Sequence, residues 1–129
     1  MSESQEQIAL FSWSRLATQE FPELRLLYCT PNGGARHKAT AGRLKAEGVR
    51  PGVPDICLPV PRGNFGACYI ELKRPHAAGK SRGRMSPEQL WWLGELQAVG
   101  NFAAVAYGWT EARRIIEEYL SAPGRQDEP

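Results

Sequence analysis

The sequence lacks long apolar segments and the paired residues that form disulfides or zinc sites. No hydrophobic run in its 129 residues approaches the roughly 18 residues that a membrane-spanning helix needs. The chain begins with MSESQEQ, a polar and acidic stretch without the apolar core of a secretory signal. The three cysteines form no C-x-x-C pair, and His37 and His76 do not provide the closely spaced ligands of a zinc site. We therefore expect free thiols, a reducing cytoplasmic environment and no membrane partner.

The composition predicts one ordinary globular domain. Hydrophobic residues make up 42% of the chain and charged residues 23%, which is enough apolar material for a single core at this length. The last residues, SAPGRQDEP, are polar and show no apolar periodicity. We expect a folded domain over residues 1–120 and a flexible C-terminal tail over residues 121–129.

The small net charge of +2 hides a strongly basic middle of the chain. Residues 36–84 contain eleven lysines and arginines but only three acids, a balance of +8. A basic region of this kind favours a polyanionic partner, of which nucleic acid is the commonest. The alternative is a solvated surface that happens to be rich in lysine and arginine.

Apolar periodicity and turn residues predict alternating helices and strands. Ser2 or Ser4 can cap a first helix, and Thr110 can cap the last one. The expected helices cover residues 4–19, 39–47, 87–99 and 111–120. The expected strands cover residues 24–29, 55–58, 67–73 and 102–107. This order predicts an α/β fold in which helices flank a small mixed β-sheet.

The stretch GVPDICLPVPRGNFGACYIELKR places three charged residues on a predicted hairpin. Side chains alternate along a strand, so Glu71 and Lys73 point to one polar face while Ile70 and Leu72 point to the core. Asp55 begins the partner strand and can lie opposite Glu71. The alternative is an ordinary hairpin that carries a Glu–Lys pair on its surface.

A divalent cation would turn two converging carboxylates from a repulsive pair into a binding site. Asp55 and Glu71 offer hard oxygen ligands, which favour Mg²⁺ or Mn²⁺, and the carbonyl of Leu72 can be a third ligand. Lys73, close to such a cation, can orient or deprotonate a water molecule and can neutralise charge on a phosphate. Acids inside a basic region would otherwise repel a polyanion, so the pattern predicts metal-dependent chemistry on phosphates.

Six motifs extend from residue 3 to residue 120: ESQEQIALFSW, PNGG, LKAEGVRPGVPDICLP, YIELKRP, SPEQ and GWTEARRIIEEYL. In their order and spacing they resemble the VRR-NUC family of the PD-(D/E)xK nuclease superfamily. The pattern is most similar to that of small stand-alone phage and bacterial members. The Val-Arg-Arg for which the family is named is absent, and VAYGW stands in that region. The residues of the expected metal site all match.

The resemblance implies a restriction-endonuclease-like core and metal-dependent hydrolysis of phosphodiester bonds in DNA. It also implies a homodimer that acts on branched DNA, such as four-way (Holliday) junctions, in the cytoplasm of a bacterium or a phage-infected host cell. The adjacent Trp91 and Trp92, or the apolar last helix, can supply the dimer interface. A non-catalytic nucleic-acid-binding module and a sequence-reading restriction-type nuclease remain alternatives.

The resemblance implies two more polar residues for the expected active site of this chain. Glu3, four residues before Gln7, matches an acid that can reach the metal directly or through water, with Glu6 as the rival. Gln89 matches a glutamine that follows the predicted loop at 74–85. Glu3 can instead be a charge that favours a helix N-terminus, and Gln89 can instead close a capping box with Ser86.

Six residues are candidates for contact with the DNA backbone. They are Asn32, Arg36, Lys38, Lys80, Arg82 and Arg84. The first three accompany the PNGG turn, whose glycines allow a phosphate to approach closely. The last three lie in residues 74–85, which show no apolar periodicity and are expected to form an exposed, mobile loop. The alternative for the PNGG segment is a plain turn.

Overall fold

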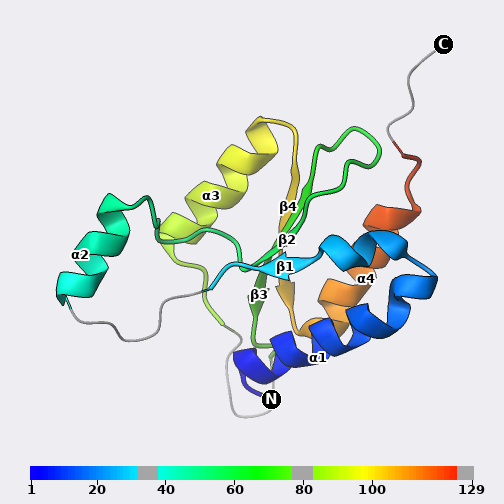
Figure 1. Ribbon diagram of the computed structural model, residues 1–129, viewed down its shortest axis with the longest axis horizontal. Coiled ribbons are helices and arrows are strands. Elements are labelled where there is room, and N and C mark those ends of the chain that lie inside the picture. The colour runs from blue at the N-terminus through cyan, green and yellow to red at the C-terminus, as the bar shows by residue number, and fades with distance from the viewer. Residues whose placement is uncertain (32–37, 77–82, 125–129) are drawn as a thin grey trace.

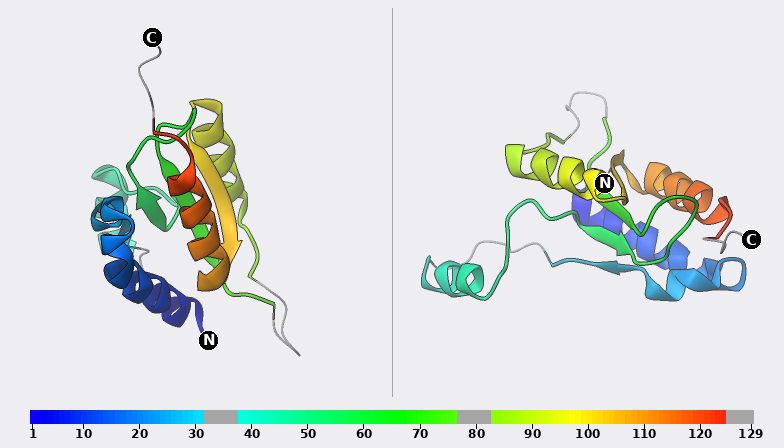
Figure 2. Two further views of the ribbon diagram at one scale, coloured as in Figure 1. Left: turned by 90° about the vertical axis from the view of Figure 1, so that its right-hand side faces the viewer. Right: turned by 90° about the horizontal axis from the view of Figure 1, so that it is seen from above.

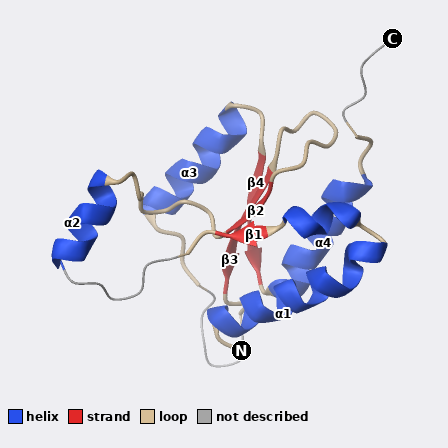
Figure 3. Cartoon of the chain, in the orientation of Figure 1, coloured by secondary structure: helices blue, strands red, loops and turns tan. Residues whose placement is uncertain are grey.

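A computed structural model describes residues 1–31, 38–76 and 83–124, in which helices cover both faces of a β-sheet (Figure 1, Figure 3). The α-helices of these ranges are Glu3–Leu16 (α1), Lys38–Ala46 (α2), Pro87–Ala98 (α3) and Trp109–Ser121 (α4). The 3₁₀ helices are Ala17–Gln19 (η1) and Pro22–Leu26 (η2). The strands are Tyr28–Cys29 (β1), Ile56–Leu58 (β2), Cys68–Lys73 (β3) and Phe102–Tyr107 (β4). No helix in the described ranges is long and apolar enough to cross a membrane.

The sheet formed by the described residues is mixed and has the strand order β1-β2-β3-β4. β2 pairs antiparallel with both of its neighbours, so β2 and β3 form the predicted hairpin, with Ile56 opposite Ile70. β4 runs parallel to β3, and α3 forms the crossover between these two strands. This layout confirms the predicted α/β fold with a small mixed sheet flanked by helices. Residues 125–129, most of the predicted tail, lie outside the described residues.

One face of the sheet builds the hydrophobic core beneath α1 and α4, and α3 lies on the other face (Figure 1, Figure 2). Ile70 and Leu72 are at most 1% exposed and belong to the same core cluster as Leu10 of α1. Side chains alternate along β3, so Glu71 and Lys73 project from the opposite face. The prediction that Ile70 and Leu72 face the core is therefore confirmed.

The predicted strand over residues 24–29 is wrong for most of its length. Pro22–Leu26 forms the 3₁₀ helix η2, and β1 keeps only the last two residues of the prediction. Leu24 and Leu27 are buried, whereas Leu26 is 53% exposed. A spacing of three between the buried residues matches the three residues per turn of a 3₁₀ helix, while a strand would bury alternate residues.

The two helices of the core face differ from the prediction at their ends. α1 ends at Leu16 and continues as η1, so the α-helix ends three residues before the predicted end at residue 19. α4 begins at Trp109, which places Thr110 inside the helix and not at its N-cap. Gly108 precedes α4 with a φ of 93°, a conformation that glycine adopts without a steric penalty.

The apolar side of α4 belongs to the core and is not available as a dimer interface. Ile116, Tyr119 and Leu120 are all buried, with exposed fractions of 0%, 6% and 7%. The hydroxyl of Tyr119 also donates a 2.6 Å hydrogen bond to the carbonyl of Val60. These three residues therefore do not supply the dimer interface that was expected of the apolar last helix.

Candidate functional site

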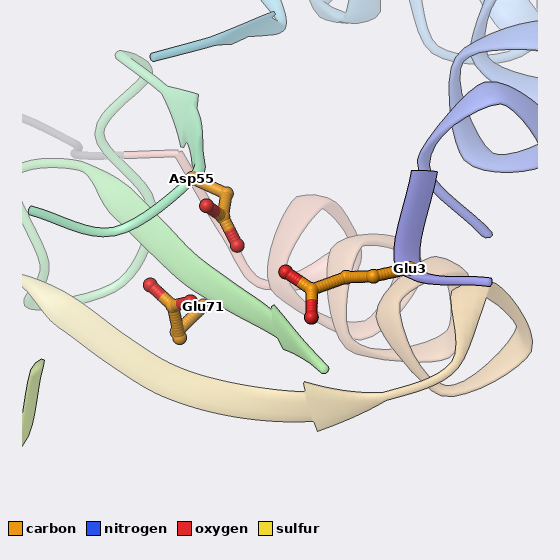
Figure 4. Close-up of side chains that lie close together, drawn as sticks. All are labelled: Glu3, Asp55 and Glu71. Carbon is orange, nitrogen blue, oxygen red and sulfur yellow. The ribbon is translucent and has the colours of Figure 1, made fainter. Parts of the chain in front are cut away.

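Three carboxylates from separate parts of the chain converge near the ends of β2 and β3 (Figure 4). Asp55 directly precedes β2, Glu71 lies in β3, and Glu3 is the first residue of α1. Each offers one oxygen, and the three oxygens all lie within 4.8 Å of one another. Asp55 and Glu71 are each 1% exposed, whereas Glu3 is exposed. We call these three residues the carboxylate cluster. The hairpin brings its two acids together on the face opposite the core, as predicted, and the structure shows that this part of the face is buried.

The backbone around β3 orients Asp55. β2 begins at Ile56, so the amide of Leu72 lies beyond the last pair of the ladder, in which Ile56 faces Ile70. Asp55 Oδ2 accepts a 3.0 Å hydrogen bond from this amide. The N–H and C=O of one strand residue point to the same side, so the Leu72 carbonyl faces the same edge as Asp55. The main-chain carbonyl of Asp55 accepts a further 2.7 Å hydrogen bond from the amide of Thr30.

The two oxygens of Glu71 have different surroundings. Oε2 accepts a 3.1 Å hydrogen bond from Gln89 Nε2, and Lys73 Nζ lies 3.7 Å from it. Oε1 is buried and accepts no hydrogen bond from a donor in the described ranges. A buried carboxylate oxygen that lacks a donor is unfavourable, so this atom has unused capacity for a ligand that the protein itself does not supply. The carboxylate cluster as a whole, with one oxygen from each of its three acids, fits a hard divalent cation.

Burial, more than any other cause, raises the pKa of Glu71 to about 8. The charge of Asp55, a hydrogen bond shared with its carboxyl group and the charge of Glu3 act in the same direction, whereas Lys73 opposes them. Burial also raises the pKa of Glu3, although Lys73 and Arg74 act to lower it. An acid that retains a proton near neutral pH, as Glu71 does, can exchange that proton for a metal cation.

Gln89 closes the capping box of α3 and also contacts the carboxylate cluster. Its backbone N–H donates a 3.1 Å hydrogen bond to Ser86 Oγ, and its Oε1 accepts a 2.9 Å hydrogen bond from the Ser86 N–H, which completes the capping box of α3. Its Nε2 donates to Glu71 at the same time. The two interpretations are compatible because the carbonyl and amino ends of one amide serve different partners.

Gly52, which sequence reasoning did not single out, controls how closely α3 approaches the segment before β2. A Cβ at this position would lie 2.6 Å from the backbone carbon of Glu88 and 2.8 Å from the amide nitrogen of Gln89. Its φ is 88°, which side-chain-bearing residues rarely adopt. The sequence feature that could have identified it is its position as the glycine of GVPD, three residues before Asp55. Only glycine permits this contact, which places Gln89 beside the carboxylate cluster.

The structure groups Glu3, and not Glu6, with Asp55 and Glu71. Glu6 is 4% exposed and lies near the start of α4, because a Cβ added to Gly108 would be 3.6 Å from Glu6 Oε1. A negative charge at a helix N-terminus is favourable, and α4 has no side-chain N-cap of its own. The nearby N-terminus of α4 therefore explains why Glu6 is buried although it does not belong to the carboxylate cluster.

Most of the candidate DNA contacts lie outside the described residues. This applies to Asn32, Arg36, Lys80 and Arg82. Lys38 is the first residue of α2, and Arg84 is exposed just before α3. The predicted phosphate contacts of all six residues therefore stay predictions.

Comparison with known proteins relates this chain to one family and its fold. The family model of the VRR-NUC domain matches residues 2–109. A solved structure described as a VRR_NUC domain protein superposes with a TM-score of 0.79 and 24% sequence identity, over 96% of this chain and 92% of the other. This likeness confirms the restriction-endonuclease-like α/β fold. No curated protein matches the sequence. Because the family model covers most of the chain, the protein belongs to the VRR-NUC family and is a nuclease-type domain.

Proposed function

We propose that this protein is a metal-dependent endonuclease that hydrolyses phosphodiester bonds in DNA. The observation that carries the proposal is the convergence of Glu3, Asp55 and Glu71 within 4.8 Å of one another, beside a lysine. Asp55 and Glu71 belong to the basic region of residues 36–84, which has a formal charge of +8. A DNA strand can approach buried acids in such a region once a cation neutralises them.

Asp55 and Glu71 would hold Mg²⁺ or Mn²⁺, with the Leu72 carbonyl as a third oxygen and Glu3 as a direct or water-mediated partner. When bound, the cation would polarise the phosphate and make a neighbouring water more acidic. The Leu72 amide and Gln89 fix the orientation of the two buried carboxylates independently of the cation. Gln89 is thus a positioning residue, because it contacts Glu71 and not the reacting atoms.

Lys73 is the residue best placed to act on the reacting phosphate or on the attacking water. Its ammonium group lies 3.7 Å from Glu71 Oε2, and the residue is only 8% exposed. In its charged form it would neutralise charge that develops on the phosphate and orient the water. The exclusion of bulk water strengthens both interactions, because the effective dielectric constant of a buried site is low.

We further propose that the active form is a homodimer that cuts branched DNA such as four-way (Holliday) junctions. One metal site in each chain makes one cut, and the resolution of a junction needs two cuts in strands related by approximate two-fold symmetry. A symmetric dimer presents two sites with that same symmetry. The rival function, a non-catalytic nucleic-acid-binding module, gives no reason for buried acids beside a lysine in a basic region.

Incubation of the purified protein with linear duplex, flap and four-way-junction DNA, with and without Mg²⁺ or Mn²⁺, tests this function. We expect cleavage only with the cation, and paired nicks at symmetry-related positions of the junction. Binding without cleavage under every metal condition would indicate the non-catalytic module. Sedimentation at micromolar concentration tests the dimer, and a monomer that nicks linear duplex as fast as junctions would contradict the branched-DNA proposal.

A further inference from the structure

A pocket lies beside the first turn of α3, adjacent to the carboxylate cluster but separate from it. It has a volume of about 340 Å³ and is lined by Arg50, Pro51, Pro87, Glu88, Trp91 and Trp92. The prolines and indoles give the pocket flat apolar walls. Arg50 and Glu88 add one positive and one negative group. We call this the α3 pocket.

Arg50 stacks on both tryptophans of the α3 pocket. Its Cζ lies 5.0 Å from the ring centre of Trp92 and 5.7 Å from that of Trp91. Trp92 Nε1 donates a 3.0 Å hydrogen bond to the carbonyl of Pro51, which fixes the orientation of this ring. Trp91 is 51% exposed, so much of its aromatic surface is accessible. A purely structural role, in which Arg50 fastens its segment to α3, does not require an exposed second indole.

The α3 pocket and the carboxylate cluster are built from the same two segments of the chain. Arg50 of the pocket and Asp55 of the cluster are five residues apart, so even a fully extended chain would separate them by at most about 18 Å. Between them, Gly52 packs against the backbone of Glu88, and the next residue of α3 is Gln89, which hydrogen-bonds the cluster. Stacked nucleotides of one strand lie about 3.4 Å apart. A single DNA strand can therefore reach both sites within roughly five nucleotides.

We infer that the α3 pocket receives an unpaired nucleobase of the DNA that the carboxylate cluster cuts, an inference that rests on the proposed nuclease function. Aromatic side chains bind bases by stacking, and this binding tolerates any sequence because every base has a π-face. The Arg50 guanidinium can donate to base acceptors, and the Glu88 carboxylate can accept from base amino groups. A phosphate is a poorer fit, because the charge of Glu88 offsets that of Arg50.

A base can enter the α3 pocket only if it is not stacked between neighbours in a continuous duplex. Strand ends, flaps and the crossover points of branched DNA provide such bases. The pocket thus gives the protein a physical means of preferring DNA with unpaired bases near the cut, without reading sequence.

Fluorescence anisotropy in EDTA measures this preference without cleavage. The probes are a labelled blunt duplex and the same duplex with a short single-stranded flap. Trp91→Ala should lower the affinity for the flap DNA about ten-fold and leave blunt-duplex binding unchanged. Leu90→Ala is the matched control, because Leu90 is the preceding residue of α3, is 57% exposed and does not line the pocket. It should leave both affinities unchanged, and Trp91→Phe should restore most of the flap preference.

A 2-aminopurine placed in the flap gives an independent readout, because its emission falls when it stacks on an aromatic ring. We expect quenching with the wild type and none with Trp91→Ala. An unchanged flap preference in Trp91→Ala, or an equal loss in Leu90→Ala, would overturn the inference. A change in the sedimentation of Trp91→Ala with an unchanged flap preference would make the pocket a contact between two copies of the chain, and would also overturn it. Base binding in a protein that cuts no DNA would support the inference and refute the proposed function.

Discussion

Gln89 Nε2 donates a 3.1 Å hydrogen bond to Glu71 Oε2, while Gln89 Oε1 accepts a 2.9 Å hydrogen bond from the N–H of Ser86. One side chain therefore couples the first turn of α3 to the buried glutamate of β3. Any change that moves the backbone at the start of α3 should therefore also move this glutamate.

Two substitutions separate the cap from the site. Ser86→Ala removes the hydrogen bond to the Gln89 amide, so it should lower the free energy of unfolding by about 1 kcal/mol and leave DNA cleavage close to the wild-type rate. Gln89→Ala removes the contact with Glu71 as well and should lower cleavage about 10- to 100-fold. Denaturant unfolding and a cleavage time course measure the two effects. Equal activities of the two variants would show that the Glu71 contact has no catalytic value.

The stability of the metal-free protein should fall as the pH rises from about 5 to 8. The pKa of Glu71 is raised from 4.5 to about 8, so between these values the folded state binds more protons than the unfolded chain does. The stabilisation is fully present below pH 4.5 and is lost as the pH rises through about 8. Glu71→Gln, which cannot ionise, should flatten this dependence.

Thermal unfolding in EDTA across this pH range measures the effect. Added Mg²⁺ should flatten the wild-type profile too, because the cation replaces the proton, and it should not change the profile of Glu71→Gln. A wild-type Tm that rises steadily from pH 5 to 8 without metal would contradict the raised pKa of Glu71.

Gly52→Ala should both destabilise the protein and slow cleavage. The new Cβ would lie 2.6 Å from the backbone of Glu88, and the φ of 88° is strained for alanine, so we expect a loss of about 1–3 kcal/mol and a shift of α3. Gly94→Ala is the matched control, because a Cβ there meets nothing within 4 Å and Gly94 lies inside α3. It should stabilise the helix by up to about 1 kcal/mol. A Gly52→Ala protein with wild-type stability and activity would show that this contact does not position Gln89.

DNA binding should depend on salt through the basic segment before α3. Replacement of Lys80, Arg82 and Arg84 together by alanine should reduce the slope of log affinity against log salt by up to about 3, if each residue neutralises one phosphate. Arg114→Ala removes an exposed cation that pairs with Glu118 on α4, and it should leave the slope unchanged. Titrations at several salt concentrations provide the slopes. An unaltered slope in the triple variant would place this segment away from the DNA.

Local alternation along the chain was sufficient to predict the hairpin. The pattern Ile70, Glu71, Leu72, Lys73 assigns two residues to each face of a strand, and the register of β2 and β3 agrees with it. The same pattern could not predict that Glu71 and Lys73 are buried. Their burial depends on residues outside the hairpin, because Gln89 of α3 contacts Glu71 and Gly83 lies against Lys73.

The features that the sequence-based prediction assigned wrongly or omitted also depend on contacts between residues far apart in the chain. The residues before β1 were assigned to a strand from their composition, but burial of Leu24 and Leu27 selects a 3₁₀ helix. Gly52 showed no pattern of its own, because its role depends on the approach of Glu88, 36 positions later in the chain. Motif likeness identified Glu3, whereas only the packing of α1 separates it from Glu6.

Mn²⁺ binding and DNA cleavage, measured on the same three proteins, test the central claim most directly. The claim is that the carboxylate cluster binds the cation that supports cleavage, with Lys73 acting beside it. Calorimetric titration should show Mn²⁺ binding to the wild type and to Lys73→Met, but not to Asp55→Asn. With Mn²⁺ and a four-way junction, the wild type should cut, while both variants should be slower by at least about 100-fold. If Asp55→Asn binds Mn²⁺ as the wild type does, or if either variant cuts at the wild-type rate, the account of this site is wrong.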